Sequence, residues 1–349
     1  MNNFLHHIVP DNINIKEALV SLNNIEDTFL ILFVTDCNGK MIGTITDGDI
    51  RRALIGGSTM EATVTKGMYR NFRFIRQKDF SLQQFKNYKE EGINLLPVLD
   101  DENKIIGIKD LKKLKSFLPV DVVIMAGGEG HRLRPLTENT PKPLLKVGDK
   151  PIIEHNIDRL ITFGVQNIHV TLRYLGKQIE DYLGDGSIKN TSIKYVTEKE
   201  KLGTLGAVGL LTAFENDVIM VMNSDLLTNI DYEDFYTNFL ETKADMLIAA
   251  VPYAVKVPYA VLETDGNRVR RFAEKPTYTY HSNAGIYLIK KELLDRISGR
   301  ELYDATDFMQ SLINEGRNVQ TYPLLEYWLD IGKHDDYKNA QEAIKHMKL

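Results

Sequence analysis

The stretch DVVIMAGGEGHRLRPLTENTPKPLL, residues 121–145, decides how the second half of this chain is interpreted. A short apolar run leads into three glycines within four residues, and Arg132, Arg134 and Lys142 follow. Glycine lets a backbone turn sharply and lie close to a ligand, while arginine and lysine bind anionic groups. The pattern predicts a loop that holds a phosphate-bearing ligand at the end of a strand.

Two common phosphate-binding loops do not fit this stretch. The P-loop requires a Lys-Ser/Thr pair after its last glycine, and no such pair follows Gly130. The dinucleotide fingerprint requires a third glycine at the place that Leu133 occupies. The residues therefore predict a different backbone loop, from Gly127 to Gly130, whose peptide groups can lie against a base or a phosphate.

The second half of the chain alternates between strand-like and helix-like segments. Strands are predicted at residues 121–125, 167–172, 192–198, 217–225 and 245–253. Helices are predicted at residues 151–164, 175–183, 203–214 and 232–243. This alternation is typical of an α/β fold with a mainly parallel sheet, in which ligands bind at the carboxyl ends of the strands.

Length and composition narrow the class of protein. The chain has 349 residues, which favours two domains, and its net charge of -5 argues against nucleic acid as a partner. The single cysteine, Cys37, excludes an internal disulfide. The start of the sequence has no signal-peptide pattern, and the apolar runs are too short to span a membrane. A cytoplasmic protein without a membrane partner is expected.

The first 117 residues contain an internal repeat. VTDCNGKMIGT (residues 34–44) aligns without gaps with VLDDENKIIGI (residues 98–108). Each copy is predicted to form a strand, a polar turn and a second strand. Helices are predicted before and after each copy, beginning near residues 15, 49, 81 and 110. Two stacked copies predict one small α+β domain at residues 1–117.

This repeat resembles a tandem pair of CBS domains. In GTITDGDIRRAL the positions of Thr46 and Asp49 match those that hold the ribose of an adenine nucleotide in that family. The second copy is three residues shorter, with only Lys109 between Ile108 and Asp110, so a second nucleotide site is not expected. The alternative is a packing module without a ligand. The resemblance implies a homodimer formed through residues 1–117.

The second half resembles the sugar-phosphate nucleotidyltransferases. MAGGEGHRLRPLT and PKPLL match the signature of that family, apart from His131 at a place usually occupied by threonine. Later motifs recur in the family's order, namely LGTLGA, NSD, EKP, NAGIY and WLDIG. The resemblance implies a catalytic domain at residues 118–349 with a Rossmann-like, GT-A-like mixed sheet that is mainly parallel.

The resemblance also implies a reaction and its residues. In this family a sugar 1-phosphate attacks the α-phosphorus of a nucleoside triphosphate and releases pyrophosphate. Arg132 and Lys142 are then catalytic, while Asp225 and Asp330 hold Mg²⁺. The sugar phosphate is expected to contact Glu274, Lys275 and Asn283. The nucleotide is expected to contact Ala126, Gly127, Gly128, Glu129, Gly130, His131, Gly203, Thr204 and Asn223.

The identities of base and sugar rest on finer resemblance. The loop LGTLGA resembles that of guanylyltransferases, which implies GTP. A CBS pair ahead of such a domain resembles the enzymes that make GDP-glucosamine from glucosamine 1-phosphate for legionaminic acid synthesis. Mannose-1-phosphate guanylyltransferase and glucose-1-phosphate uridylyl- or thymidylyltransferase are the alternatives. An alternative of a different class is a nucleotide sensor without catalytic activity.

Overall fold

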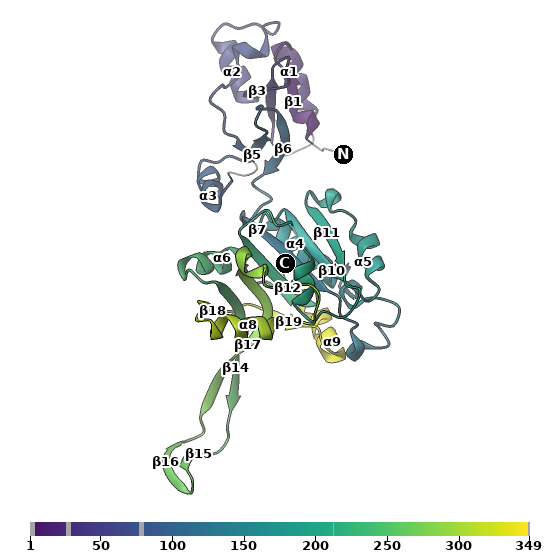
Figure 1. Ribbon diagram of the computed structural model, residues 1–349. Helices are drawn as coiled ribbons and strands as arrows, with labels where there is room; N and C mark the ends of the chain where they lie inside the picture. The colour runs from purple at the N-terminus through teal and green to yellow at the C-terminus, as the bar shows by residue number, and fades with distance from the viewer. Residues whose placement is uncertain (1–3, 26–28, 77–79, 212, 348–349) are drawn as a thin grey trace. The chain divides into compact units, whose positions relative to one another are not determined.

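The computed structural model of the chain describes residues 4–25, 29–76, 80–211 and 213–347. The chain divides into two compact units, Met1–Phe117 and Leu118–Leu349 (Figure 1). Within the described ranges, every helix is too short or too polar to cross a bilayer.

The first unit contains two similar three-stranded sheets, ordered β1-β2-β3 and β4-β5-β6. In each sheet the first two strands are parallel and the last two antiparallel. This arrangement confirms the predicted repeat. Its helices and strands are β1 (Ile8–Pro10), α1 (Ile15–Asn23), β2 (Ile31–Thr35), β3 (Met41–Thr46), α2 (Asp47–Ile55), β4 (Ile75–Arg76), α3 (Leu82–Glu90), β5 (Leu95–Leu99) and β6 (Ile105–Asp110), with 3₁₀ turns at Leu5–His7 and Val64–Lys66.

The two polar turns of the repeat are built in the same way. Asp36 Oδ1 accepts hydrogen bonds from the backbone N–H groups two and four residues on, at 2.9 and 2.8 Å. Asp100 Oδ1 accepts the equivalent pair at 2.9 and 2.8 Å. An aspartate side chain that satisfies its own turn favours a tight reversal between strands. The aligned residues Lys40 and Lys104 then meet in an antiparallel bridge.

The helix predicted from Asp110 is wrong. In the first copy Thr46 caps α2 through a capping box with Asp49, which satisfies backbone N–H groups at the start of the helix. In the second copy Asp110 still belongs to β6, and the residue three positions earlier, Gly107, has no side chain to act as a cap. Asp110 Oδ1 instead accepts hydrogen bonds from the backbone N–H groups of Lys112 and Lys113, at 3.0 and 3.4 Å, and these bonds form a turn.

The second unit is built on a seven-stranded mixed sheet, ordered β11-β10-β7-β12-β17-β14-β18. Strands β11, β10, β7 and β12 are mutually parallel, whereas β17 runs antiparallel to β12 and β14. This arrangement confirms the mainly parallel α/β fold. The sheet strands are β7 (Val120–Ala126), β10 (Asn167–Leu172), β11 (Ser192–Thr197), β12 (Val218–Asn223), β14 (Met246–Lys256), β17 (Thr277–Lys290) and β18 (Val319–Pro323).

Helices and small ribbons complete this unit. The helices are α4 (Ile152–Thr162), α5 (Gly176–Leu183), α6 (Tyr232–Glu241), α7 (Lys291–Leu294), α8 (Ala305–Asn314) and α9 (His334–Ala343), with 3₁₀ turns at His131–Leu133, Lys142–Leu144, Ser187–Lys189 and Gly206–Leu210. The two-stranded ribbons pair β8 (Lys146–Val147) with β9 (Lys150–Pro151), β13 (Leu226–Thr228) with β19 (Trp328–Asp330), and β15 (Val261–Asp265) with β16 (Arg268–Ala273).

The face of the central sheet that leads to the site is apolar along most of its length. Val123 of β7 and Val221 of β12 are paired and pack with Phe308 of α8. Side chains alternate between the two faces of a strand, so the positions two residues on lie on the same face. These positions are Met125 and Asn223, which also pair with each other. The buried core therefore ends where the polar site begins.

The helix predicted at residues 203–214 is replaced by a 3₁₀ turn at Gly206–Leu210, and Thr212 lies outside the described residues. The N–H groups of Leu205 and Gly206 donate to the carbonyl of Tyr303 at 3.0 and 2.9 Å. A Cβ atom at Gly209 would lie 2.2 Å from the carbonyl oxygen of Ile297. This segment packs backbone to backbone, and the tertiary contact overrides its helical pattern.

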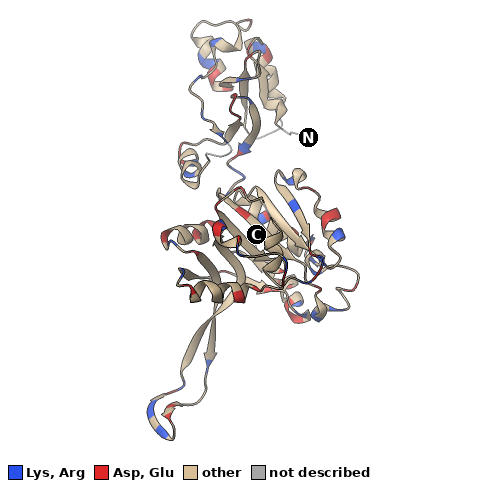
Figure 2. Cartoon of the chain, viewed as in Figure 1, with Lys and Arg blue, Asp and Glu red and all other residues tan. Residues whose placement is uncertain are grey.

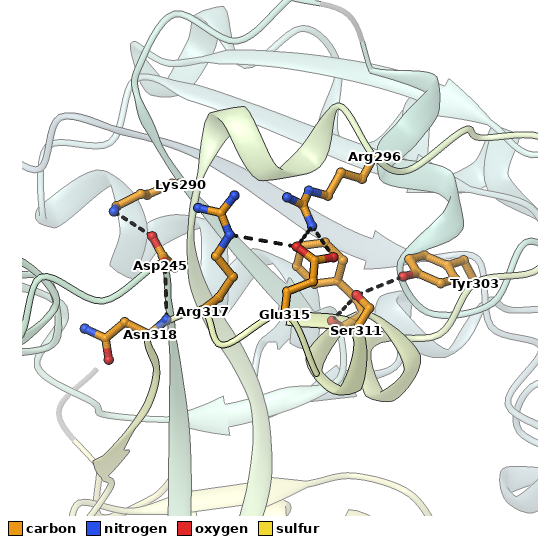
Figure 3. A network of polar contacts seen from close by, with 9 residues as sticks. Asp245, Lys290, Arg296, Tyr303, Ser311, Glu315, Arg317 and Asn318 are labelled. Carbon is orange, nitrogen blue, oxygen red and sulfur yellow. Dashed lines mark hydrogen bonds and ion pairs between the residues drawn. The ribbon is translucent and has the colours of Figure 1, made fainter. Parts of the chain in front are cut away.

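A polar network fixes the end of the sheet that lies opposite the site (Figure 3). Asp245 accepts from Lys290 Nζ at 2.7 Å and from the N–H of Asn318 at 3.0 Å, which joins the ends of β14, β17 and β18. The carboxylate of Glu315, at the end of α8, accepts hydrogen bonds from the Arg296 guanidinium. The start of β14 and the end of β17 are therefore tied to β18 at this end of the sheet.

Strands β14 and β17 continue beyond the sheet as an antiparallel ribbon (Figure 1). Along β14 the residues from Met246 to Ala250 are buried, whereas those from Pro252 to Lys256 are exposed. The ribbon ends in the small β15–β16 hairpin. We call residues 251–282 the arm.

Candidate active site

A cavity of about 330 Å³ lies where four parallel strands end. Residues that follow β7, β10, β11 and β12 all contribute to its wall, as expected for a sheet of this kind. The lining residues are Met125, Gly127, Gly128, Lys142, Pro143, Thr171, Arg173, Glu198, Lys201, Gly203, Thr204, Asn223, Ser224, Asp225, Leu302 and Asp304. Seven of the residues predicted from the sequence are therefore brought together.

The glycine loop forms one wall of the cavity. Ala126 is buried at the end of β7, and Gly127 follows it against the carboxylate of Glu198. A Cβ atom at Gly127 would lie 2.7 Å from Glu198 Oε1, so a larger residue would displace that carboxylate. Gly130 turns the chain with φ at 64°, and its carbonyl accepts from Thr137 Oγ1 at 2.8 Å.

Glu129 and His131 lie outside the cavity lining and interact with their neighbours. Glu129 Oε1 accepts from Arg173 at 3.1 Å, and Glu129 Oε2 lies 2.6 Å from His131 Nε2. The hydrogen bond from Arg173 lowers the pKa of the Glu129 carboxyl. Arg173 itself lines the cavity, so this contact fixes one of its walls.

Asp225 and Asp330 are brought together by the pairing of β13 with β19. Leu226, which follows Asp225, is registered directly opposite Asp330. The N–H of Ile331 also donates to the carbonyl of Asp225 at 3.1 Å. Two aspartates more than one hundred positions apart therefore lie side by side.

Lys142 contacts both of these carboxylates. Its ammonium donates to Asp225 Oδ2 and lies 3.8 Å from Asp330 Oδ1. The Lys142 side chain is 11% exposed, so a large part of the attraction escapes solvent screening. Burial, and then the charge of Asp225, raise the pKa of the Asp330 carboxyl, while Lys142 and Arg132 oppose that shift.

Arg132 lies on the outer side of the same charge cluster. A Cβ atom at Gly332 would lie 3.2 Å from the Arg132 guanidinium, which places this group beside the segment after β19. Arg132 does not line the cavity but remains exposed next to it. Arg134 is also exposed, and its carbonyl accepts from His334 Nε2 at 2.9 Å.

The loop at Gly203 and Thr204 is anchored to the start of α8. Asp304 Oδ1 accepts from the Thr204 N–H at 2.8 Å and from Thr204 Oγ1 at 3.1 Å. Thr204 Oγ1 in turn accepts from the N–H of Ala305 at 2.8 Å. Both loop residues and Asp304 line the cavity, so α8 positions this wall.

The residues predicted to contact the sugar phosphate are not brought to the cavity as a group. Asn283 lies near the base of the arm, where its amide donates to Tyr287 Oη at 2.9 Å. Glu274 and Lys275 lie farther out on the arm and are exposed. Neither of them lines the cavity. Their predicted role stays a prediction.

Thr46 and Asp49 of the first unit lie together at the start of α2. Asp49 Oδ2 accepts from Thr46 Oγ1 at 2.6 Å, and Asp49 Oδ1 accepts from Arg52 at 2.5 Å. A cavity of about 270 Å³ in this unit includes Thr44, two residues before Thr46 on β3, together with Ile31, Phe33, Tyr69, Asn71, Phe72, Arg73, Glu91, Ile93, Leu95 and Pro97.

Several residues that line the cavity of the second unit were not predicted from the sequence. Arg173 follows β10 directly and Glu198 follows β11, so the strand-end rule applied to every strand would have found both. Burial raises the pKa of the Glu198 carboxyl, whose Oε2 accepts from the Leu202 N–H at 3.2 Å. Leu302 and Asp304 precede a helix and gave no such signal.

The sequence is similar to those of known nucleotide-sugar enzymes. Mannose-1-phosphate guanylyltransferase from Mycobacterium tuberculosis is 32% identical over 224 residues, which are 62% of each chain. The bifunctional protein GlmU from Methanocaldococcus jannaschii is 32% identical over 64% of this chain and 54% of its own length. The chain thus covers less than two thirds of the length of these relatives.

Solved structures give the same result. HddC from Yersinia pseudotuberculosis, solved in complex with GMP-PN, is 27% identical and superposes with a TM-score of 0.51. The match covers 64% of this chain and 99% of HddC. Residues 6–56 match the CBS domain family. Residues 121–347, well over half of the sequence, match the nucleotidyl transferase family, to which this chain therefore belongs.

Proposed function

We propose that the chain transfers a guanylyl group from GTP to a sugar 1-phosphate, with glucosamine 1-phosphate as the acceptor. The observation that carries this proposal is the cluster of Lys142, Asp225 and Asp330 beside a cavity walled by the backbone of Gly127 and Gly128. Such a cluster suits a polyphosphate accompanied by a cation. The guanylyl group is supported by the similarity to the guanylyltransferase from Mycobacterium tuberculosis and to HddC, which was solved with GMP-PN.

Mannose 1-phosphate is the second candidate acceptor. The relative from Mycobacterium tuberculosis is described as acting on that sugar phosphate. Glucosamine 1-phosphate is preferred because a CBS domain precedes the catalytic unit, which is the arrangement on which the sequence resemblance rests.

The reaction needs positioning and charge more than a base. An anionic oxygen of the sugar phosphate attacks the α-phosphorus, and the bond to the leaving pyrophosphate breaks. No proton must be removed from the nucleophile, so the main obstacle is repulsion between two polyanions. Lys142 can hold the α-phosphate because it lines the cavity, and Arg132 can meet the pyrophosphate because it is exposed beside the same cluster. The backbone of Gly127 and Gly128 orients the nucleotide.

The residues present fit Mg²⁺. Asp225 Oδ1 and Asp330 Oδ1 are buried and have no hydrogen-bond partner among the described residues. Within the described ranges, no cluster of three or more acidic, histidine or cysteine side chains could hold a metal, so phosphate oxygens and water would supply the remaining ligands. This division is usual for Mg²⁺ in phosphoryl-transfer sites. When bound, the cation would neutralise phosphate charge beside these carboxylates.

Turnover tests the proposal directly. The purified protein is incubated with GTP, ATP, UTP or dTTP and with glucosamine, mannose or glucose 1-phosphate, and pyrophosphate release is measured. GTP with glucosamine 1-phosphate is expected to be fastest, and Asp225→Asn is expected to lower kcat at least about a hundredfold because a cation ligand is lost. Specific nucleotide binding without pyrophosphate release from any pair would support the non-catalytic sensor instead.

Two arginines of one loop provide a matched pair. Arg132→Ala is expected to lower kcat/KM at least about tenfold, because its guanidinium lies beside the charge cluster. Arg134→Ala, which removes the same charge two residues away, is expected to have a smaller effect. A larger loss in Arg134→Ala than in Arg132→Ala would contradict the proposed orientation of the loop.

The charge cluster also predicts a stability effect. The raised pKa of Asp330 means that the folded protein binds this proton more tightly than the unfolded chain, so the ionised carboxylate destabilises the metal-free fold at neutral pH. Asp330→Asn is therefore expected to raise the melting temperature at pH 7.5 without Mg²⁺ by about 2 °C at most, because the Asp330 side chain is 41% exposed and solvent screens part of the cost.

The pH dependence and a control variant check that the ionised carboxylate of Asp330 causes this effect. The gain from Asp330→Asn should shrink as the pH falls through the raised pKa of Asp330, because the wild-type carboxyl then becomes neutral. Asp149→Asn, at an exposed turn, removes the same charge and should leave the melting temperature nearly unchanged. An equal gain at every pH, or in both variants, would exclude the proposed origin.

For the first unit we propose an adenine nucleotide held by Thr46 and Asp49. Asp49→Asn is expected to weaken binding of ATP or AMP at least about tenfold in isothermal titration, because a charge-assisted hydrogen bond to the ribose is lost. Asp110→Asn, the aligned residue of the shortened copy, serves as the control and should not change the affinity. No measurable binding by the wild type would favour a packing module without a ligand.

A further inference from the structure

Helix α4 carries three polar side chains that are almost completely buried. His155, Asn156 and Arg159 are 9%, 2% and 4% exposed. Charged residues are few along the strands of the central sheet, so polar side chains inside this unit stand out (Figure 2). Burial of a polar group lowers stability unless the group is hydrogen-bonded. The partners of these three side chains therefore indicate what the helix holds in place.

Each of the three side chains hydrogen-bonds to a backbone carbonyl of a distant segment. The pairs are His155 with Val147 at 2.8 Å, Asn156 with Leu226 at 2.9 Å, and Arg159 with Ile230. Two of these carbonyls, those of Leu226 and Ile230, belong to the segment that begins directly after Asp225. Ile152 of α4 also packs in one core cluster with Leu227 of β13. Helix α4 therefore fixes the chain that follows Asp225.

Asn156 closes an edge of the β13–β19 ribbon. Among the described residues, β13 pairs with β19 alone. On that side the carbonyl of Asp225 accepts from the N–H of Ile331 at 3.1 Å. Successive carbonyls of a strand point to opposite edges, so the carbonyl of Leu226 faces away from β19. The Asn156 amide supplies the hydrogen bond that a third strand would otherwise supply.

These contacts constrain where Asp225 places its carboxylate. Its own carbonyl is tied to β19, and the next carbonyl, at Leu226, is tied to α4. In the side chain, Oδ2 accepts from Lys142, whereas Oδ1 has no hydrogen-bond partner among the described residues. The backbone therefore carries much of the positioning. A displacement of about 1 Å is enough to impair a functional site.

Arg159 offers a comparison on the same helix. Its guanidinium donates to the carbonyl of Ile230, five residues beyond Asp225. Arg159 and Asn156 are both buried, and both hold a carbonyl of the same segment. Only the carbonyl held by Asn156 belongs to the residue next to Asp225. The two side chains therefore differ in their distance from the charge cluster along the chain more than in their local role.

We infer that Asn156 is a positioning residue for Asp225. Through the Leu226 carbonyl it holds that carboxylate within reach of Lys142 and Asp330. The inference rests on the proposed function, because it treats Asp225 as a ligand of the divalent cation. Asn156 lies outside the cavity lining, so it acts through the chain that carries Asp225. Loss of its amide should lower the affinity for the cation and leave the glycine wall of the cavity unchanged.

Mn²⁺ binding to the full-length chain tests this role without any turnover. Free Mn²⁺ is followed by electron paramagnetic resonance while the ion is titrated into the wild type, Asn156→Ser and Arg159→Met. Asn156→Ser is expected to weaken Mn²⁺ binding at least about tenfold, a typical loss when the support of a metal ligand is removed. The serine hydroxyl bonds to a carbonyl of its own helix and not to Leu226. Arg159→Met should change the affinity less than about twofold.

The Mg²⁺ dependence of turnover gives a second readout. With GTP and the best acceptor, Asn156→Ser should raise the Mg²⁺ concentration for half-maximal rate at least about tenfold and recover most of the wild-type kcat at saturating Mg²⁺. A purely structural role would lower the melting temperatures of Asn156→Ser and Arg159→Met but would not separate their Mg²⁺ requirements. Asn156→Ala repeats the test if Asn156→Ser does not fold.

The outcomes separate the positioning role from the proposed reaction. Equal Mn²⁺ affinities of the wild type and Asn156→Ser, or equal losses in Asn156→Ser and Arg159→Met, would overturn the positioning role even in an active enzyme. A selective loss in Asn156→Ser, with no pyrophosphate released from any substrate pair, would support the positioning role and reject the proposed reaction. If the wild type binds no Mn²⁺, alone or with GTP, the cation site and the positioning role are both wrong.

Discussion

The contact of Lys142 with Asp225 and Asp330 is the constraint on which the site depends. Two carboxylates placed side by side repel each other, and partial burial adds a desolvation cost that a single lysine offsets only in part. The cluster is therefore better explained by what it binds than by what it contributes to folding. The divalent cation that we propose would supply the positive charge that offsets the second carboxylate.

The fold provides this cluster through strand ends and one small ribbon. The parallel strands β7, β10, β11 and β12 deliver backbone and polar side chains to one edge of the sheet. The β13–β19 ribbon then brings Asp330, from near the end of the chain, beside Asp225. Burial of an apolar core under this edge fixes the strands, so the polar groups are positioned before any ligand arrives.

Local patterns in the sequence predicted the features that local chemistry determines. The strands, the repeat and its aspartate turns follow from alternation and turn residues, and the loop at Gly127 to Gly130 follows from its glycines. The helix expected from Asp110 failed because its cap was deleted, and the helix expected at residues 203–214 failed because the carbonyl of Tyr303 captures its N–H groups. Such competition between distant segments leaves no mark in a single sequence. The resemblance, and not spacing, placed Asp330 in the site.

The arm is a second feature that the sequence alone does not explain. Its sequence alternates as an ordinary half-buried strand does, with tyrosine and valine on one face and threonine, alanine and lysine on the other. That pattern predicts that one face is covered, but it does not identify the covering surface. Only the structure shows that β14 and β17 leave the sheet and that Lys275 goes with them.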